Sequence, residues 1–110
     1  MVCLSSSPPG PERGILSTIY VRPNASVTAN QIRDCLLAFY HDKPFVRVVG
    51  HLPATRFVAH TNYCDISVRE SDGWIILLST IDNLVKGASG AAVQNLNCMM
   101  GLEPTTGLIP

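Results

Sequence analysis

The residues best suited to chemistry lie between Asp82 and Asn95, where an apolar segment gives way to a predicted helix. Asp82 offers a carboxylate that can accept hydrogen bonds from the unpaired amides of a first helical turn. The following residues are mostly small, so a ligand or another helix can approach the backbone closely. A helix start suits carboxamide, carboxylate or phosphate oxygens, although no GxGxxG pattern supports the dinucleotide fingerprint. A ligand site and helix packing through small residues both remain open on this evidence.

The cysteines and histidines form no recognisable catalytic or metal-binding pattern. The four cysteines show no Cys-x-x-Cys spacing. Cys64 precedes Asp65, whose charge would oppose a thiolate. We therefore expect the cysteines to pack as small apolar residues in a reducing compartment, with no metal site and no catalytic residue.

Composition argues against several kinds of partner. Eight basic and eight acidic residues give a formal net charge of zero, and no cluster of Lys or Arg predicts nucleic-acid binding. No signal peptide and no run of roughly 20 apolar residues is present, so we expect no membrane span and a cytoplasmic location. Hydrophobic residues make up 46% of the chain and charged residues 15%, an apolar load that predicts contact with a partner.

The first half of the chain predicts a disordered lead, a strand, a helix and a short strand. Residues 1–12 are rich in Ser and Pro, which disfavours regular structure. Residues 15–22 alternate as a strand, and Thr28 with Gln31 forms a capping box for a helix that starts near Ala29. That helix carries one apolar stripe, formed by Ile32, Cys35, Leu36 and Phe39, and Pro44 ends it before a strand at 45–49.

The second half predicts a hairpin and a final helix. A long strand runs from about 57 to 70, a turn follows at 71–73, and an antiparallel strand at 74–81 is apolar enough to be covered on both faces. The last helix ends at Met100, with Gly101 in the C′ position. Together these elements predict an α+β fold with an open mixed or antiparallel sheet of about four strands and two main helices.

Several motifs resemble the C-terminal end of the N-acetyl-gamma-glutamyl-phosphate reductase family, a branch of the semialdehyde dehydrogenases. They are residues 13–21, residues 61–68 with the run Asn-Tyr-Cys-Asp at 62–65, the run from Ile81 to Asn97, and residues 99–108, which end in Thr-Thr-Gly-Leu. Their order matches that of the family, and they cover nearly everything from Arg13 onward.

The resemblance implies a fold like the C-terminal domain of glyceraldehyde-3-phosphate dehydrogenase-like enzymes. Residues 13–110 would then be a C-terminal dimerisation and substrate domain fragment, including the final helix that returns to the Rossmann domain. The implied partners are the missing N-terminal Rossmann part and a second copy that associates through the sheet. The implied activity is NADPH-dependent reduction of an acyl phosphate to a semialdehyde in arginine biosynthesis.

The resemblance also implies which residues touch the cofactor. Asn83 would lie near the nicotinamide carboxamide, and Lys86, Gly87 and Ala88 would follow at the same helix start. NADP would bind only in the context of the full-length enzyme. The family nucleophile sits in a Gly-Cys turn, and no Gly-Cys occurs here, while His41, His51 and His60 match no family motif. We therefore expect the chain to be inactive alone.

Two alternatives stay open. One is a non-catalytic oligomerisation module that kept this fold. The other is a fragment of aspartate-semialdehyde dehydrogenase, which shares the Asp-Asn-Leu pattern at 82–84 and the Lys-Gly-Ala pattern at 86–88. The Asn-Tyr-Cys-Asp run and the Thr-Thr-Gly-Leu tail favour the arginine-pathway enzyme.

Overall fold

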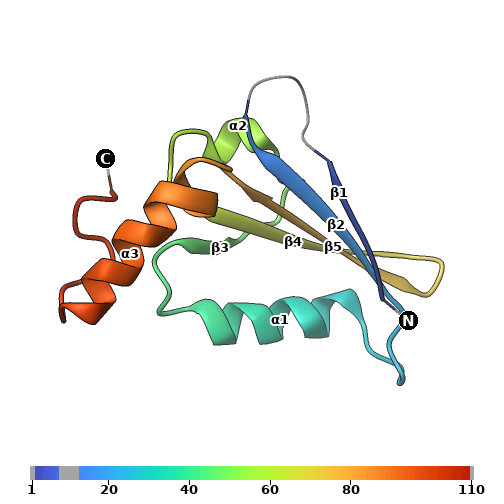
Figure 1. The fold of residues 1–110 in the computed structure, drawn as a ribbon. Coiled ribbons are helices and arrows are strands. Elements are labelled where there is room, and N and C mark those ends of the chain that lie inside the picture. Colours follow the sequence, from blue (N-terminus) through green and yellow to red (C-terminus); the bar gives the residue numbers. More distant parts are fainter. Residues whose placement is uncertain (1, 8–12, 110) are drawn as a thin grey trace.

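A computed structural model describes residues 2–7 and 13–109, and side chains within 13–109 (Figure 1). It confirms the expected α+β class. The elements are β1 (Val2–Ser7), β2 (Ile15–Val21), α1 (Ala29–Tyr40), β3 (Val46–Val48), α2 (Thr55–Val58), β4 (Cys64–Ser71), β5 (Trp74–Ile81), the π-helix η1 (Val85–Ser89) and α3 (Gly90–Met99).

One mixed sheet with the strand order β1-β2-β5-β4-β3 organises these elements. All neighbouring strands are antiparallel except β3, which runs parallel to β4. The hairpin between β4 and β5 turns on Asp72 and Gly73, which both have positive φ (50° and 79°). This combination is typical of a two-residue hairpin turn, so the antiparallel return predicted for residues 74–81 is confirmed.

The sheet has an edge strand where we expected disorder. Val2–Ser7 forms β1 and pairs antiparallel with β2, from Val2 opposite Val21 to Ser7 opposite Leu16. The expectation of a disordered lead is therefore wrong for residues 2–7, because the free edge of β2 offers backbone partners that local composition does not reveal. For residues 1 and 8–12 that expectation lies outside the described residues.

The long strand expected at 57–70 is also wrong in its first half. Residues Thr55–Val58 form α2, and β4 begins only at Cys64. Between them the Thr61 hydroxyl donates to the Val58 carbonyl (2.6 Å) and accepts from the Tyr63 amide (3.3 Å). These local bonds close a turn that competes with the extended conformation.

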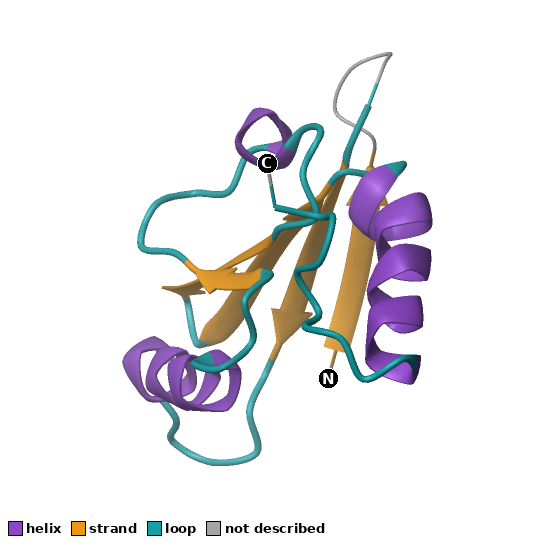
Figure 2. Cartoon of the chain, turned by 90° about the vertical axis from the view of Figure 1, so that its left-hand side faces the viewer, coloured by secondary structure: helices purple, strands orange, loops and turns teal. Residues whose placement is uncertain are grey.

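Helices α1 and α2 lie on opposite faces of the sheet (Figure 2). The Ala29 amide at the start of α1 donates to Glu70 of β4 (3.2 Å), whereas Arg47 joins Asp65 of β4 to the Phe57 carbonyl of α2. Glu70 and Asp65 are five residues apart, so they point to opposite faces. Neither helix covers all of β5, where only Ile75 and Thr80 are fully buried, so the expected burial of this strand on both faces is only partly met.

Helix α1 begins as predicted, with both halves of the capping box in place. Thr28 Oγ1 accepts from the Gln31 amide (3.2 Å), and Gln31 Oε1 accepts from the Thr28 amide (3.0 Å). The expected apolar stripe is divided, because Ile32 and Leu36 are half-buried while Cys35 and Phe39 are exposed. The packed face of α1 is therefore narrower than the stripe.

Helix α3 lies beyond one end of the sheet and continues from η1 (Figure 1). Its C-terminal end is close to the predicted one, with Gly101 in the left-handed conformation (φ 69°) that suits a C′ residue. Asn97 is buried, and its side-chain nitrogen donates to the carbonyls of Pro104 (3.1 Å) and Thr106 (2.9 Å). These bonds hold the following tail against the helix.

Candidate functional site

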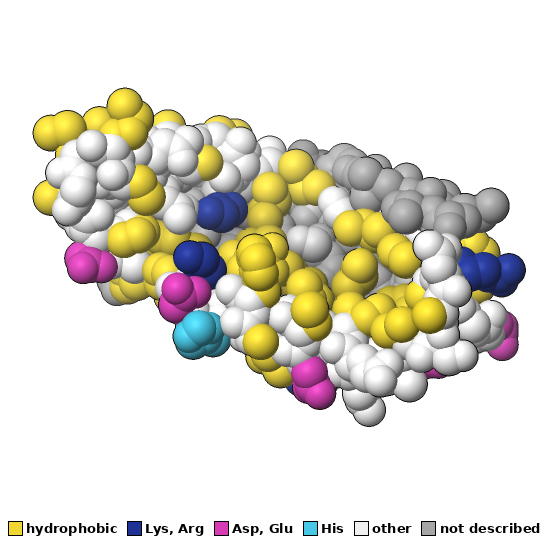
Figure 3. Space-filling model, turned by 90° about the horizontal axis from the view of Figure 1, so that it is seen from below, with side chains coloured by type: hydrophobic (Ala, Val, Ile, Leu, Met, Phe, Trp, Pro, Cys, Tyr) yellow, Lys and Arg dark blue, Asp and Glu magenta, His cyan; other side chains and the backbone are white. Residues whose placement is uncertain are grey.

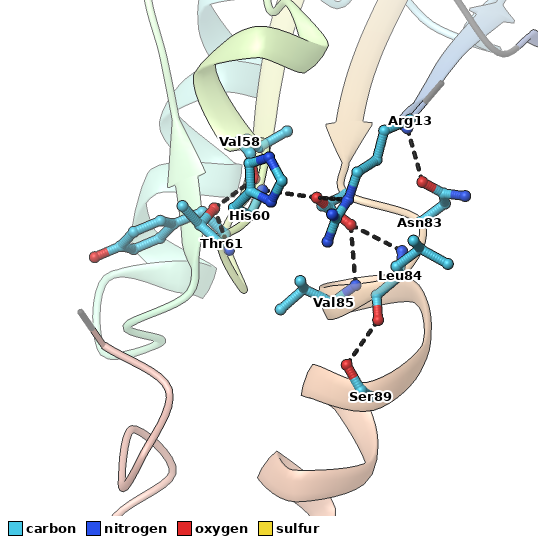
Figure 4. A network of polar contacts seen from close by, with 11 residues as sticks. Arg13, Val58, His60, Thr61, Asn83, Leu84, Val85 and Ser89 are labelled. Atoms are coloured by element: carbon cyan, nitrogen blue, oxygen red, sulfur yellow. Dashed lines mark hydrogen bonds and ion pairs between the residues drawn. The ribbon is translucent and has the colours of Figure 1, made fainter. Parts of the chain in front are cut away.

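Asp82 follows β5 directly and is the centre of a polar network that includes Arg13, His60, Leu84 and Val85, which Figure 4 labels. Its side chain is fully buried. Oδ2 accepts from the His60 amide (2.7 Å) and forms an ion pair with Arg13 Nε (2.7 Å). Oδ1 accepts from the amides of Leu84 (2.8 Å) and Val85 (3.0 Å). The sequence-based expectation that Asp82 holds the amides of the following turn is confirmed.

These contacts explain the ionisation of Asp82. Burial by itself would raise the pKa of this carboxyl, because the charged form loses its hydration. The three backbone amides and the Arg13 guanidinium outweigh that effect, so the pKa of Asp82 lies below its ordinary value. The side chain is therefore a carboxylate at neutral pH, and it acts as a structural anion rather than a proton carrier.

Asn83 is held by the start of β2. Its Oδ1 accepts from the Gly14 amide (2.7 Å), across a sequence separation of 69 residues. The side-chain nitrogen of Asn83 points away from Arg13 and Asp82 (Figure 4). An Asn side chain has two N–H donors besides its oxygen, so this residue presents donors on the side away from the network.

The helix start after Asn83 is a wide π-turn. The Gly87 amide donates to the Asp82 carbonyl (3.0 Å), and the Ser89 amide and hydroxyl both donate to the Leu84 carbonyl (3.0 and 2.7 Å). Such turns are rare and occur frequently at functional sites. Here the wide turn directly follows Asp82, whose carboxylate accepts from the amides of Leu84 and Val85.

The small residues of this helix start serve two different purposes. Gly90 is buried against Asn62, and a methyl group at position 90 would overlap Asn62 Oδ1 and lie 2.7 Å from the Val85 carbonyl oxygen. Gly87 and Ala88 are instead exposed, and a methyl group at position 87 would make only ordinary contacts. Close packing within the chain therefore explains why a glycine stands at position 90. It does not explain the small residues at 87 and 88, whose surface is free for contact with a ligand or partner.

Lys86 points toward α3 and is half-buried. Its Nζ donates to Gln94 Oε1 (2.7 Å) and lies 5.7 Å from the centre of the Phe45 ring. Gln94 Oε1 also accepts from Asn62 Nδ2 (3.0 Å). The structure therefore joins Lys86 to α3, whereas Asn83 is joined to β2.

Several residues of this site were missed by sequence reasoning. They are Arg13, Gly14, His60, Asn62 and Gln94. Their contacts join distant segments, which no local periodicity indicates. His60 has positive φ (62°), which is uncommon outside glycine and marks a backbone held by its surroundings. The available signal was the family match, in which Arg13 and Gly14, Asn62, and Gln94 each lie within a matching segment, whereas His60 lies outside all of them.

Other candidate chemistry is weak in the part of the chain that the structure describes. Within it, no three side chains among His, Cys, Asp and Glu gather closely enough to hold a metal ion. Cys35 and Cys98 are exposed, and Cys64 is half-buried with its Sγ 3.4 Å from Ser79 Oγ. None of the helices in residues 2–7 and 13–109 has both the length and the apolar character needed to span a membrane.

Comparisons with known proteins identify the family of the chain. A family model described as the semialdehyde dehydrogenase dimerisation domain matches residues 10–83. The chain belongs to this family.

Relatives named N-acetyl-gamma-glutamyl-phosphate reductase match nearly the whole chain. The protein from Magnetococcus marinus is 54% identical over 100 residues, which are 87% of this chain and 29% of that protein. The protein from Rhodopirellula baltica is 51% identical over 105 residues (89% and 30%), and that from Citrifermentans bemidjiense is 54% identical over 101 residues (88% and 29%). The family resemblance inferred from the motifs is confirmed. The chain spans less than a third of the length of these relatives.

Proposed function

We propose that this chain is the C-terminal part of an NADPH-dependent N-acetyl-gamma-glutamyl-phosphate reductase. The complete enzyme would reduce an acyl phosphate to a semialdehyde in arginine biosynthesis. The observation that carries the proposal is the arrangement of Asp82, Asn83 and the exposed Gly87 and Ala88 at one helix start, in a chain about half identical to proteins of that name.

The cofactor contact that we propose is made by Asn83. The Gly14 amide already donates to the side-chain oxygen of Asn83. The side-chain nitrogen, which points outward, can therefore donate to the carbonyl oxygen of the nicotinamide carboxamide. The exposed Gly87 and Ala88 carry no bulky side chains and leave room for the cofactor. Lys86 lies on the same turn, and Gln94 takes one of its three donors.

The hydride acceptor would be a thioester formed on a cysteine of the preceding part of the enzyme. Gly-Cys is absent from this sequence, and of the cysteines within residues 13–109, Cys35 and Cys98 are exposed while Cys64 lies in β4 with its Sγ beside Ser79 Oγ. We therefore propose that residues 13–110 supply one wall of the site and are inactive alone. The proposed setting is the cytoplasm, where the exposed Cys35 and Cys98 stay reduced.

The apolar surface supports two partners for the chain. Exposed apolar side chains gather on α3 and the tail after it, where we propose that the Rossmann part docks: Val93, Leu96, Met99, Met100 and Leu102. Figure 3 shows apolar side chains at this end and across the middle of the molecule. For the second partner, another copy of the chain, we propose the parts of the sheet that α1 and α2 leave half-exposed, such as around Tyr20 and Ile76.

Segment exchange tests the activity. Residues 13–110 would replace the matching C-terminal segment of the Magnetococcus marinus relative, and NADP⁺ reduction by N-acetylglutamate semialdehyde would be followed with and without phosphate. We expect phosphate-dependent turnover by the hybrid and none by the isolated chain. Turnover by the isolated chain, or a preference of the hybrid for aspartate semialdehyde, would contradict the proposal. A discrete dimer of the isolated chain in gel filtration together with an inactive hybrid would favour the alternative oligomerisation module.

A cofactor analogue tests Asn83. In 3-acetylpyridine adenine dinucleotide phosphate the carboxamide is replaced by an acetyl group, which keeps the carbonyl oxygen and has no amide N–H. Asn83→Asp in the hybrid removes the outward donor, so we expect KM to rise for both NADP⁺ and the analogue by about tenfold or more. An unchanged KM for both would show that Asn83 does not contact the nicotinamide.

A further inference from the structure

Two contacts join the start of β2 to the end of β5. Arg13 Nε forms the ion pair with Asp82 Oδ2, and the Gly14 amide donates to Asn83 Oδ1, each at 2.7 Å. The two residue pairs lie just beyond the last pair of the antiparallel strands, in which Ile15 lies opposite Ile81, and each is offset by one residue from that register. The side chain of Asn83 is therefore held from a segment that precedes it by 69 residues.

Any other residue at position 14 would displace the hydrogen bond between the position-14 amide and Asn83 Oδ1. Its φ is +105°, a conformation that residues with side chains rarely adopt. A methyl group at position 14 would also lie 2.7 Å from both Cβ and Cγ2 of Thr55 in α2. Because Gly14 is buried, relief would require a shift of the β2 start or of α2.

We propose that Gly14 is a positioning residue for Asn83. Its backbone amide holds the Asn83 oxygen inward and so sets the side-chain nitrogen outward, where the cofactor is proposed to lie. This inference rests on the proposed function for its consequence in catalysis, but the contact itself exists in the chain alone. Thr55 contributes indirectly, because its side chain keeps position 14 restricted to glycine.

Hydrogen exchange of the chain tests the contact without any cofactor. Asn83→Ala removes the acceptor of the Gly14 amide, whereas Asn83→Asp keeps an oxygen that can accept the same bond. By NMR we expect Gly14 exchange to be faster by about tenfold or more in Asn83→Ala and close to the original rate in Asn83→Asp. The Leu84 and Val85 amides, which bond to Asp82, should keep their rates in both variants. Unchanged Gly14 exchange in Asn83→Ala would overturn the inference.

Two glycine variants of the segment-exchanged enzyme test the catalytic consequence. Gly14→Ala should raise KM for NADP⁺ by about tenfold, with KM for the semialdehyde within about twofold of its original value. Gly73→Ala is the matched control, because Gly73 also has positive φ (+79°) but has open space around its Cβ position. It should lose less thermal stability than Gly14→Ala, because only the backbone conformation is unfavourable there, and it should keep both KM values.

The outcomes separate the positioning role from the proposed function. Equal effects of Gly14→Ala and Gly73→Ala on both KM values would reduce Gly14 to a structural role and overturn the inference. If Asn83→Asp leaves the cofactor KM unchanged, the proposed role of Asn83 fails, and the hydrogen-exchange result still decides whether Gly14 holds its side chain.

Discussion

At the scale of single residues, one buried carboxylate organises the end of the sheet. Asp82 binds the Arg13 guanidinium and the His60 amide from distant segments, and the amides of Leu84 and Val85 from the turn that follows it. A buried charge is tolerated only when it is paired and hydrogen-bonded, and removing part of such a set leaves the remaining groups unsatisfied. Asp82 is therefore the residue at which a small chemical change should have the largest effect on stability.

Asp82→Asn should destabilise the chain by about 2–4 kcal/mol, because the amide group cannot pair with Arg13 and cannot accept all the same bonds. The measurement is urea unfolding at pH 7 followed by circular dichroism. Asp72→Asn is the control, since Asp72 is exposed in the hairpin turn and should change the free energy of unfolding by less than about 0.5 kcal/mol. Equal effects of the two substitutions would contradict the central role of Asp82.

The same carboxylate should make the chain sensitive to acid. Because the pKa of Asp82 is lower in the folded state than its ordinary value, the folded state binds this proton less readily than the unfolded state. Its contribution is present above the ordinary carboxyl pKa of about 4 and is lost as pH falls through the lowered folded value. Unfolding measured from pH 2 to 7 should show a steeper loss of stability below about pH 4 in the original chain than in Asp82→Asn.

Gly90 and Gly87 should respond in opposite ways to alanine. Gly90→Ala would force a methyl group against Asn62 and the Val85 carbonyl, so we expect a loss of about 1–3 kcal/mol or more. Gly87→Ala meets only ordinary contacts in a helical turn and should be neutral or stabilising by up to about 1 kcal/mol. Thermal unfolding of both variants checks this, and a larger loss for Gly87→Ala would reverse our assignment of packing and open positions.

At the scale of elements, the apolar stripe of α1 is wider than the face of the helix that packs against the sheet. Only Ile32 and Leu36 of the four stripe residues are partly covered by the sheet, while Cys35 and Phe39 are exposed. A helix crossing two strands of a small sheet contacts them along a narrow line.

This division predicts unequal effects of truncation in α1. Leu36→Ala should cost about 1–2 kcal/mol, because it removes partly buried methyl groups. Phe39 is 67% exposed, so Phe39→Ala should cost less than about 0.5 kcal/mol in the isolated chain. Denaturant unfolding of the two variants at low protein concentration provides the comparison. A larger cost at Phe39 would mean that this ring packs against something in solution.

At the scale of the whole molecule, the balance of buried and exposed apolar groups points to partners. Among residues 13–109 the large hydrophobic side chains that are buried are Phe45, Val58, Val68 and Ile75. A larger set is exposed, much of it on α3 and its tail. A small chain that buries little apolar surface gains little stability from it. Association should therefore contribute much of the stability of this domain.

Charges placed on α3 should separate folding from association. The double substitution Leu96→Asp and Met99→Asp should leave the circular dichroism spectrum of the isolated chain close to the original, since these side chains are 55% and 82% exposed. It should weaken binding to the separately expressed preceding segment of the Magnetococcus marinus relative by at least about tenfold, because desolvated charges would enter an apolar contact. Asn95→Asp on the same helix is the control. Unchanged binding of the double variant would place the contact elsewhere.

Several elements of the fold and one part of the site could be predicted from the sequence, because they depend on residues that are close together along the chain. The capping box of Thr28 and Gln31, the hairpin at 71–73 and the carboxylate of Asp82 over the next turn all involve residues a few positions apart. The α+β class followed from the same local patterns, and the family followed from runs of matching residues.

Tertiary structure alone decided how the site is assembled. The Gly14 bond to Asn83, the Arg13 pair with Asp82 and the approach of Asn62 to Gly90 each join distant segments, so no local periodicity encodes them. Pairing with the free edge of β2 also overturned a local expectation, because it ordered residues 2–7. The strand expected from 57 was ended by local side-chain bonds of Thr61, which its strand-like pattern did not reveal. Local sequence patterns predict the helices and strands. A buried charge or an unpaired strand edge, by contrast, takes its hydrogen-bond partners from any segment that the fold places beside it.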